Sequence, residues 1–261
     1  MIDIFEAAVK ALQAGESVAL ATIVQSHGST PRAMGAKMLV FADNHVVGSI
    51  GGGPMENEVI QEAQSALETG IPRLVHYTLK EVDSGHMGVC GGENDVFIDI
   101  IAGRKQLIIV GAGHVGEQLS KQGAFLGMEV IIMDDRSEYA NKKRFPAAHR
   151  IIVGDVAEEL KQFPITPWSH VVIVTRGHEL DGVALSSVIH SPARYIGMIG
   201  SRTKKARIYK ELNEQGIEQE LLNRVHAPIG LDIGAETPEE IAISIMAEII
   251  SIGRKTQSAA F

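Results

Sequence analysis

Short apolar runs and longer segments of helical period alternate through the second half of the chain, from about residue 104 onward. This alternation is typical of a doubly wound α/β unit, in which a parallel sheet carries helices on both faces. The interval at residues 135–149 is short and polar, so we expect a truncated crossover helix there. The expected strands are Leu107–Val110, Val130–Met133, Arg150–Val153, Val171–Val174 and Tyr195–Ile199.

The first hundred residues have a different pattern, which predicts a smaller α+β unit. The chain starts with an amphipathic helix that has Phe5, Val9 and Leu12 on one stripe, and a second helix is expected from Pro54 to about Gly70. The expected strands are Ser17–Gln25, Lys37–Phe41, Val46–Ile50, Arg73–Leu79 and Asn94–Ile101. Because the pattern changes near Ala102–Lys105, we expect one domain over residues 1–103 and a Rossmann-like domain over residues 104–261.

The segment Gln106–Gly116, QLIIVGAGHVG, has the form of the first strand and turn of a dinucleotide-binding unit. Gly111 allows a tight turn, Gly113 lets the backbone approach a pyrophosphate, and Gly116 lets the next helix pack closely on the strand. The free N–H groups of that helix then face the anion. Asp134 ends the next apolar run and is expected to bind a ribose.

Three arginines lie in turns where a ligand phosphate is expected. Arg176 and Arg202 follow expected strands of the second half, at the edge where open α/β sheets bind ligands. Arg32 follows the turn residues HGSTP, and Gly52 and Gly53 belong to a second glycine run. For each arginine, the alternative is an ordinary solvated surface cation.

Cys90 is the single cysteine of the chain, and it lies between Gly88 and Gly91. Flanking glycines allow the backbone to approach a ligand and expose a soft thiolate, whereas the alternative is a small buried hydrophobic residue. The histidines have no metal-ligand spacing, so a zinc site is not expected. The sequence also contains no Ser/His/Asp spacing and no nucleophile elbow, so no catalytic set is visible.

Composition narrows the class of protein. Hydrophobic residues make up 45% and charged residues 21% of the 261 residues, as in ordinary globular proteins. A net charge of −8 argues against binding to nucleic acid, and no apolar run has membrane-spanning length. One cysteine cannot form an internal disulfide, so we expect a cytoplasmic protein.

Seven segments together resemble the XdhC/CoxI family, whose members are accessory factors for xanthine dehydrogenase and related molybdenum hydroxylases. They run in the family's order from about residue 27 to residue 253: HGSTPRAMGAKM, GSIGGGPMENEV, GVCGGENDVFI, IIVGAGHVG, VTRGHELD, YIGMIGSRTK and RVHAPIGLDIGAETPEEIAISIMAEI. The resemblance implies an N-terminal XdhC/CoxI domain followed by an XdhC Rossmann domain. It also implies binding of the molybdenum cofactor (molybdopterin), sulfuration of that cofactor with a cysteine desulfurase, and delivery to the apo-hydroxylase.

The resemblance places the family's glycine-flanked cysteine on Cys90, as a molybdenum ligand or a sulfur relay, next to Gly91. Some similar sequences carry a second cysteine where this chain has Pro54. Because the combined motifs resemble this family and no catalytic set is visible, a cofactor-insertion chaperone is expected rather than a catalyst, with a homodimer as the expected assembly. Two alternatives remain: an NAD(P)-dependent oxidoreductase, suggested by the glycine turn and Asp134, and a Rossmann unit that serves only as a dimerisation platform.

Overall fold

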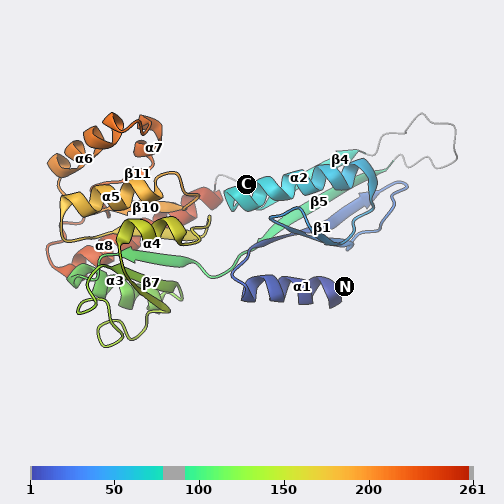
Figure 1. The fold of residues 1–261 in the computed structure, drawn as a ribbon. Helices are drawn as coiled ribbons and strands as arrows, with labels where there is room; N and C mark the ends of the chain where they lie inside the picture. Colours follow the sequence, from blue (N-terminus) through green and yellow to red (C-terminus); the bar gives the residue numbers. More distant parts are fainter. Residues whose placement is uncertain (1, 79–91, 259–261) are drawn as a thin grey trace. The chain divides into compact units, whose positions relative to one another are not determined.

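The computed structural model of the protein describes residues 2–78 and 92–258, with side chains described as far as Gly253 (Figure 1). It contains two compact units, of which the first consists mainly of the residues up to Gly103 and the second covers Arg104–Lys255. Each unit has its own hydrophobic cores. Cys90 and Gly91 lie outside the described residues.

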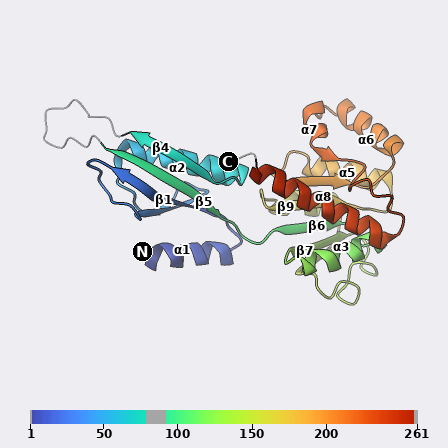
Figure 2. The same cartoon turned by 180° about the vertical axis from the view of Figure 1, so that it is seen from behind.

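The first unit is an antiparallel five-stranded sheet with one helix on each face (Figures 1 and 2). Successive residues of the central strand enter opposite cores, since Ala19 and Ala21 pack on the side of α2 and Val18 and Leu20 on the side of α1. The strand order is β3-β2-β1-β5-β4. The elements are α1 (Ile2–Gln13), β1 (Val18–His27), β2 (Lys37–Phe41), β3 (Val46–Gly48), α2 (Gly53–Thr69), β4 (Arg73–Thr78) and β5 (Glu93–Ile101).

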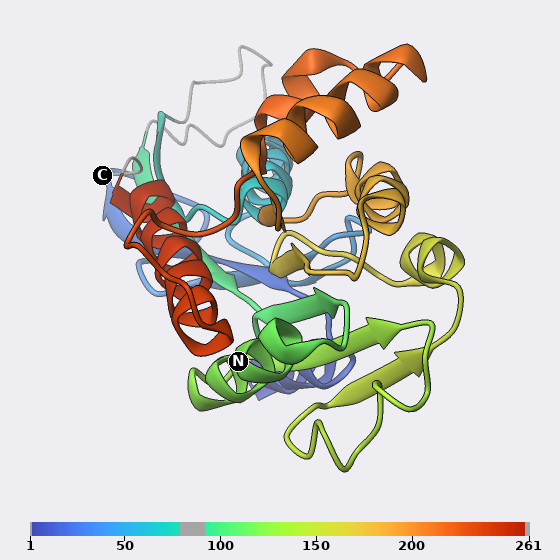
Figure 3. The same ribbon diagram turned by 90° about the vertical axis from the view of Figure 1, so that its left-hand side faces the viewer.

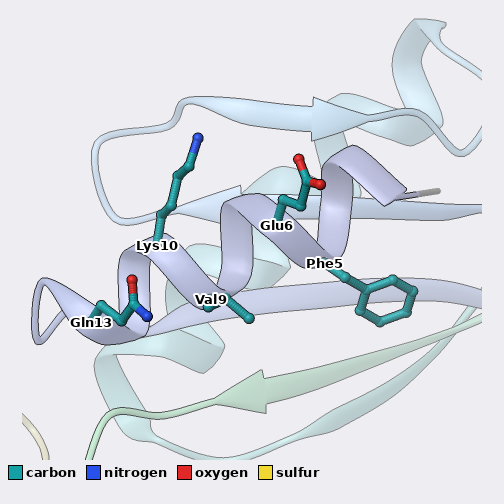
Figure 4. A pocket seen from close by; sticks show the side chains of 5 residues that line it. All are labelled: Phe5, Glu6, Val9, Lys10 and Gln13. Carbon is teal, nitrogen blue, oxygen red and sulfur yellow. The ribbon is translucent and has the colours of Figure 1, made fainter.

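The first helix, α1, forms where the sequence predicts it, but it turns a different face to the sheet. Its buried residues are Ile4, Ala8 and Ala11, because the small alanines let the helix lie close to the strands. Phe5 and Val9 are 47% and 51% exposed. With Glu6, Lys10 and Gln13 they line a hollow of about 390 Å³ on the outer side of α1 (Figure 4).

The second unit is a six-stranded parallel sheet of order β11-β10-β9-β6-β7-β8. Its strands are β6 (Gln106–Val110), β7 (Glu129–Asp134), β8 (Arg150–Val153), β9 (Ser169–Ile173), β10 (Tyr195–Met198) and β11 (Val225–His226). Its helices are α3 (His114–Phe125), α4 (Val156–Gln162), α5 (His178–Val188), α6 (Arg202–Glu214), α7 (Gln219–Asn223) and α8 (Pro238–Ser258). This is the doubly wound arrangement that the alternating pattern predicts, and the α/β fold class is confirmed.

Helices cover both faces of the parallel sheet (Figure 3). Alternate residues of β6 show this: Ile108 and Val110 pack with α4, α5 and α6, whereas Leu107 and Ile109 pack with α3 and α8. The helix α8 begins with the capping box that the sequence predicts, because Thr237 and Glu240 accept hydrogen bonds from each other's backbone N–H groups.

The crossover at residues 135–149 differs from the prediction. It contains turns and no helix, so the expected truncated helix was wrong. Phe145 is fully buried there and Ala140 and Ala148 nearly so, and Asn141 accepts and donates hydrogen bonds within the segment. These contacts order the segment without helical backbone, and the polar residues favour turns.

Candidate functional site

The glycine turn between β6 and α3 has little space at two of its three glycines. Gly111 has φ +120°, and a Cβ there would lie 2.4 Å from the carbonyl oxygen of Val174 at the end of β9. A Cβ on Gly116 would lie 2.2 Å from the carbonyl oxygen of Gly111. Both positions therefore require glycine for the packing of the turn itself.

Gly113 is different, because nothing lies within 4 Å of a Cβ built on it and its φ of −73° suits any residue. It is the N-cap of α3, with no side-chain cap. The first N–H groups of a helix have no partner within the helix. The open space at Gly113 thus lies beside backbone donors that suit an anion.

Asp134, the expected ribose-binding acid, is buried at the end of β7 and accepts four hydrogen bonds. Its Oδ2 accepts from the N–H of Ala112 (2.7 Å) and from Nη2 of Arg136 (2.9 Å). Its Oδ1 accepts from the backbone N–H (3.0 Å) and Nε (2.9 Å) of Arg136. Burial alone would raise the pKa of Asp134, but the hydrogen bonds from Arg136 and Ala112 bring that pKa below its usual value.

A second arginine from the same crossover holds the other side of the turn. Nη1 of Arg144 donates to the carbonyl oxygen of Ala112 at 2.7 Å, and Nη2 donates to Glu117 at 3.0 Å. The Cζ atoms of Arg136 and Arg144 lie 4.0 Å and 5.2 Å from the ring centroid of Tyr139. The glycine turn is therefore fixed at both its N–H and its C=O by side chains from residues 134–144.

An ion pair joins the two strands that flank β6. Nη2 of Arg176, just after β9, donates to Oδ2 of Asp135, just after β7, at 2.7 Å. Because β6 lies between β7 and β9 in the sheet, this pair spans the carboxyl end of β6. That edge is where parallel α/β sheets bind their ligands.

A buried carboxylate lies one strand further along the same edge. Asp181 on α5 is fully buried, accepts a hydrogen bond from the hydroxyl of Thr175, and forms an ion pair with Lys204 of α6. Burial raises the pKa of Asp181, against the opposing effects of Lys204 and Thr175. Gly200 lies over Lys204, since a Cβ there would approach Cδ of that lysine to 2.7 Å.

The structure thus brings five predicted site residues of the second unit to one sheet edge: Gly111, Gly113, Gly116, Asp134 and Arg176. Arg202 starts α6 beyond β10 on an exposed position. Sequence reasoning missed Arg136, Arg144 and Lys204. For Arg136 a signal was available, because an arginine near the ribose acid is typical of sites for 2′-phosphorylated dinucleotides.

In the first unit, three segments that the sequence singles out lie together. A Cβ on Gly92 would lie 2.5 Å from the carbonyl oxygen of Ser29, and one on Gly51 would lie 3.2 Å from Cβ of Pro31. The turn that carries Arg32 therefore contacts the glycine run and the described end of the Cys90 segment. Arg32 is exposed.

Gly52 and Gly53 have open space at their Cβ positions and φ values of 75° and 72°. The carboxylate of Glu56 accepts hydrogen bonds from the hydroxyl of Ser49 and from the N–H groups of Ile50 and Gly52. Two backbone donors of this loop are therefore already satisfied by an internal anion.

Within the described residues, no three side chains of His, Cys, Asp or Glu are grouped to hold a metal ion. In that same part of the chain, none of the helices combines the length and hydropathy needed to span a bilayer.

The fold defines the class of protein: a Rossmann-type unit preceded by a small α+β unit. Comparison of the sequence with models of known protein families then identifies the family. Residues 107–249 match the model of the XdhC Rossmann domain, and residues 11–78 match that of the XdhC and CoxI family. The chain belongs to the XdhC/CoxI family, which confirms the resemblance read from the sequence.

Relatives agree with this assignment. The uncharacterized protein YqeB of Escherichia coli is 37% identical over 253 residues, which cover 96% of this chain and 46% of YqeB, so the chain spans about half the length of that relative. A protein of Bacillus subtilis named as a probable xanthine dehydrogenase subunit is 24% identical, over 94% of this chain and 96% of that protein. The molybdenum cofactor insertion chaperone PaoD of E. coli is 24% identical, over 94% of this chain and 86% of PaoD.

A crystal structure of a xanthine dehydrogenase from Bacillus halodurans has the same fold. The two chains are 24% identical, each is covered to 97%, and the TM-score is 0.56.

Proposed function

We propose that this protein is an accessory factor that binds the molybdenum cofactor and inserts it into a molybdenum hydroxylase of the xanthine dehydrogenase type. The observation that carries the proposal is membership of the XdhC/CoxI family in both units, together with a relative named as a molybdenum cofactor insertion chaperone. The cofactor is cargo in this proposal, and the chain serves as a carrier rather than a catalyst.

The residues of the second unit fit a phosphorylated cargo. Gly113 leaves open space beside the first N–H groups of α3, and the turn is held in place by Asp134 and Arg144 before any ligand arrives. A fixed turn loses little conformational freedom on binding, which favours affinity. We assign the phosphate of the cofactor to this turn.

The residues of the first unit supply the groups for molybdenum chemistry. Cys90 would supply a thiolate as a soft molybdenum ligand or as a sulfur relay, an assignment that comes from the family resemblance. When bound, the cofactor would supply the molybdenum centre at which the proposed sulfuration would take place. Gly91, Gly52, Gly53 and Arg32 belong to the same proposed binding surface, which the contacts of Gly92 and Gly51 with the Arg32 turn support.

Sulfuration of the cofactor, a cysteine desulfurase partner and a homodimer complete the proposal, and the cytoplasm is the proposed compartment. The second candidate function is an NAD(P)-dependent oxidoreductase. The glycine turn favours it, but the saturated carboxylate of Asp134 disfavours NAD, whose ribose has free hydroxyls, so that only the 2′-phosphorylated NADP suits the site.

The test is purification of the full chain from cells with and without molybdenum cofactor synthesis, followed by assays of bound molybdenum and of pterin fluorescence. We expect both on the wild type and a loss of molybdenum on Cys90→Ala. A Ser29→Ala variant in the neighbouring turn serves as the matched control and retains both. The proposal fails when the wild type from cofactor-producing cells carries neither molybdenum nor pterin.

A further inference from the structure

Asp134 has no capacity for a further hydrogen bond. A carboxylate has about four lone-pair sites, two on each oxygen. In Asp134 each oxygen already accepts two hydrogen bonds, and the side chain is 4% exposed. No lone pair remains for the hydroxyls of a ribose. Asp134 therefore stabilises the glycine turn and the Arg136 side chain, and it is not the group that a ligand meets.

The partly exposed side chain beside Asp134 at the end of β7 is Arg136. Its Nε and Nη2 donate to Asp134, whereas Nη1 has no hydrogen bond among the described residues. The side chain is 20% exposed, and its guanidinium lies on the ring of Tyr139 with Cζ 4.0 Å from the centroid. A guanidinium fixed in this way loses little freedom when it donates its remaining N–H groups to a phosphate oxygen.

The neighbouring charges do not oppose an anion at this place. Asp135 is the nearest other carboxylate, at 3.6 Å from Nε of Arg136, and it also pairs with Arg176. Arg144 pairs with Glu117 on the other side of the turn. The charges described around the ribose position therefore consist of three arginines and three carboxylates. Within the described residues, Arg136 keeps an unused donor, as Arg176 does, and of these two it is the one held beside Asp134.

We propose that Arg136 recognises a phosphomonoester on the ligand that binds at the glycine turn, and that the site selects such a ligand over the same ligand with a free ribose hydroxyl. The inference rests on the ligand site assigned to the second unit under the proposed function. Two sources share this chemistry. One is a nucleotide with a 2′-phosphate, whose other phosphate lies at the turn; the other is the phosphate of the molybdenum cofactor, which the turn and Arg136 would then hold together.

The experiment compares 2′,5′-ADP with 5′-AMP by calorimetric titration of the full-length protein, since the two nucleotides differ only in the 2′-phosphate. We expect 2′,5′-ADP to bind at least about tenfold more tightly, as a charge-assisted hydrogen bond to a fixed guanidinium allows. In Arg136→Gln that preference disappears. AMP then binds as well as before or better, because Asp134 regains acceptor sites for ribose hydroxyls.

Weaker binding of 2′,5′-ADP together with unchanged or tighter binding of AMP separates recognition from a purely structural role of Arg136. A structural role would weaken the binding of both nucleotides alike. Arg136→Lys keeps the positive charge and retains part of the preference. Arg150→Gln, at the amino end of β8, is the matched control and changes neither affinity. Equal affinities of the wild type for the two nucleotides, no binding of either, or an unchanged ratio in Arg136→Gln would each overturn the proposal.

The two sources of phosphate are distinguished by pterin retention. A loss of retained pterin in Arg136→Gln, together with the loss of the 2′-phosphate preference, assigns Arg136 to the cofactor's phosphate. Unchanged pterin retention with a lost preference assigns it to a nucleotide. Because molybdenum and pterin on the wild type are measured independently, failure of the phosphate preference leaves the proposed carrier function standing or falling on its own assay.

Discussion

The three glycines of the turn provide the sharpest test of the second unit, because the structure gives them different roles. In Gly116→Ala the new Cβ would lie 2.2 Å from the carbonyl oxygen of Gly111, so the strand and helix must separate. Overpacking of this kind costs about 1–3 kcal/mol. For a unit of this size we expect the melting temperature to fall by roughly 3–10 °C.

In Gly113→Ala the Cβ meets nothing within 4 Å and φ is ordinary, so the fold should tolerate it. The change from glycine to alanine at an N-cap costs about 1 kcal/mol or less. Ligand binding, by contrast, should weaken at least about tenfold, because the methyl group would enter the space proposed for the ligand's phosphate.

The assay measures thermal unfolding and cofactor retention on the same preparations of both variants. Gly182→Ala, inside α5 with only an ordinary contact at 3.8 Å, is the control and changes neither quantity for the worse. A Gly113→Ala protein that melts like Gly116→Ala would refute the open turn. One that retains the cofactor fully would refute the placement of the ligand.

Three further predictions concern stability. Burial lowers the pKa of His170 to about 4 despite its hydrogen bond to the Gln106 carbonyl, so the unfolded chain binds a proton at higher pH than the folded one. Acidification from pH 7 to pH 4 should lower the free energy of unfolding by up to about 3 kcal/mol in the wild type and by less in His170→Gln. Urea unfolding at both pH values measures this difference. Lys204→Met leaves Asp181 buried without its cation and should lower the free energy of unfolding by about 3–5 kcal/mol. Adding Asp181→Leu should restore most of that stability, because the unpaired buried charge is removed. Additive losses of stability in the double variant would contradict this account. Glu56→Gln should lower the free energy of unfolding by about 1 kcal/mol at pH 7, measured by urea unfolding, because it weakens charge-assisted hydrogen bonds in the glycine run. Burial alone would raise the pKa of Glu56, but the hydrogen bonds from Ser49 and the backbone bring that pKa below its usual value. The difference in stability between Glu56→Gln and the wild type should therefore shrink in acid.

Much of the fold follows from the sequence because its signals are local. The glycine spacing, the apolar runs and the capping box of α8 each depend on residues within a few positions of one another, and the structure has all three. The face of α1 could not be predicted in this way. The helix has one apolar stripe with Phe5 and another with Ile4 and Ala8. The stripe with Ile4 and Ala8 is the buried one, and which stripe is buried depends on how closely the sheet approaches the helix.

The candidate site was predicted in part, for the same reason. Gly111 and Asp134 carry a sequence signal, but the saturation of Asp134 requires the positions of Ala112 and Arg136 in space. Arg144 lies in a crossover that has no helical period, and it reaches the carbonyl of Ala112, 32 positions earlier in the chain. Such contacts leave no periodic trace, so only the structure shows that the turn is held from both sides.

The two glycine runs also show why glycine content alone does not locate an anion site. In the first unit, Glu56 accepts the N–H groups of Ile50 and Gly52, and Pro54 removes a further donor from the start of α2. In the second unit, Asp134 accepts only the N–H of Ala112 from the glycine turn, and the first N–H groups of α3 remain beside open space. Backbone donors for a phosphate are therefore concentrated in the second unit.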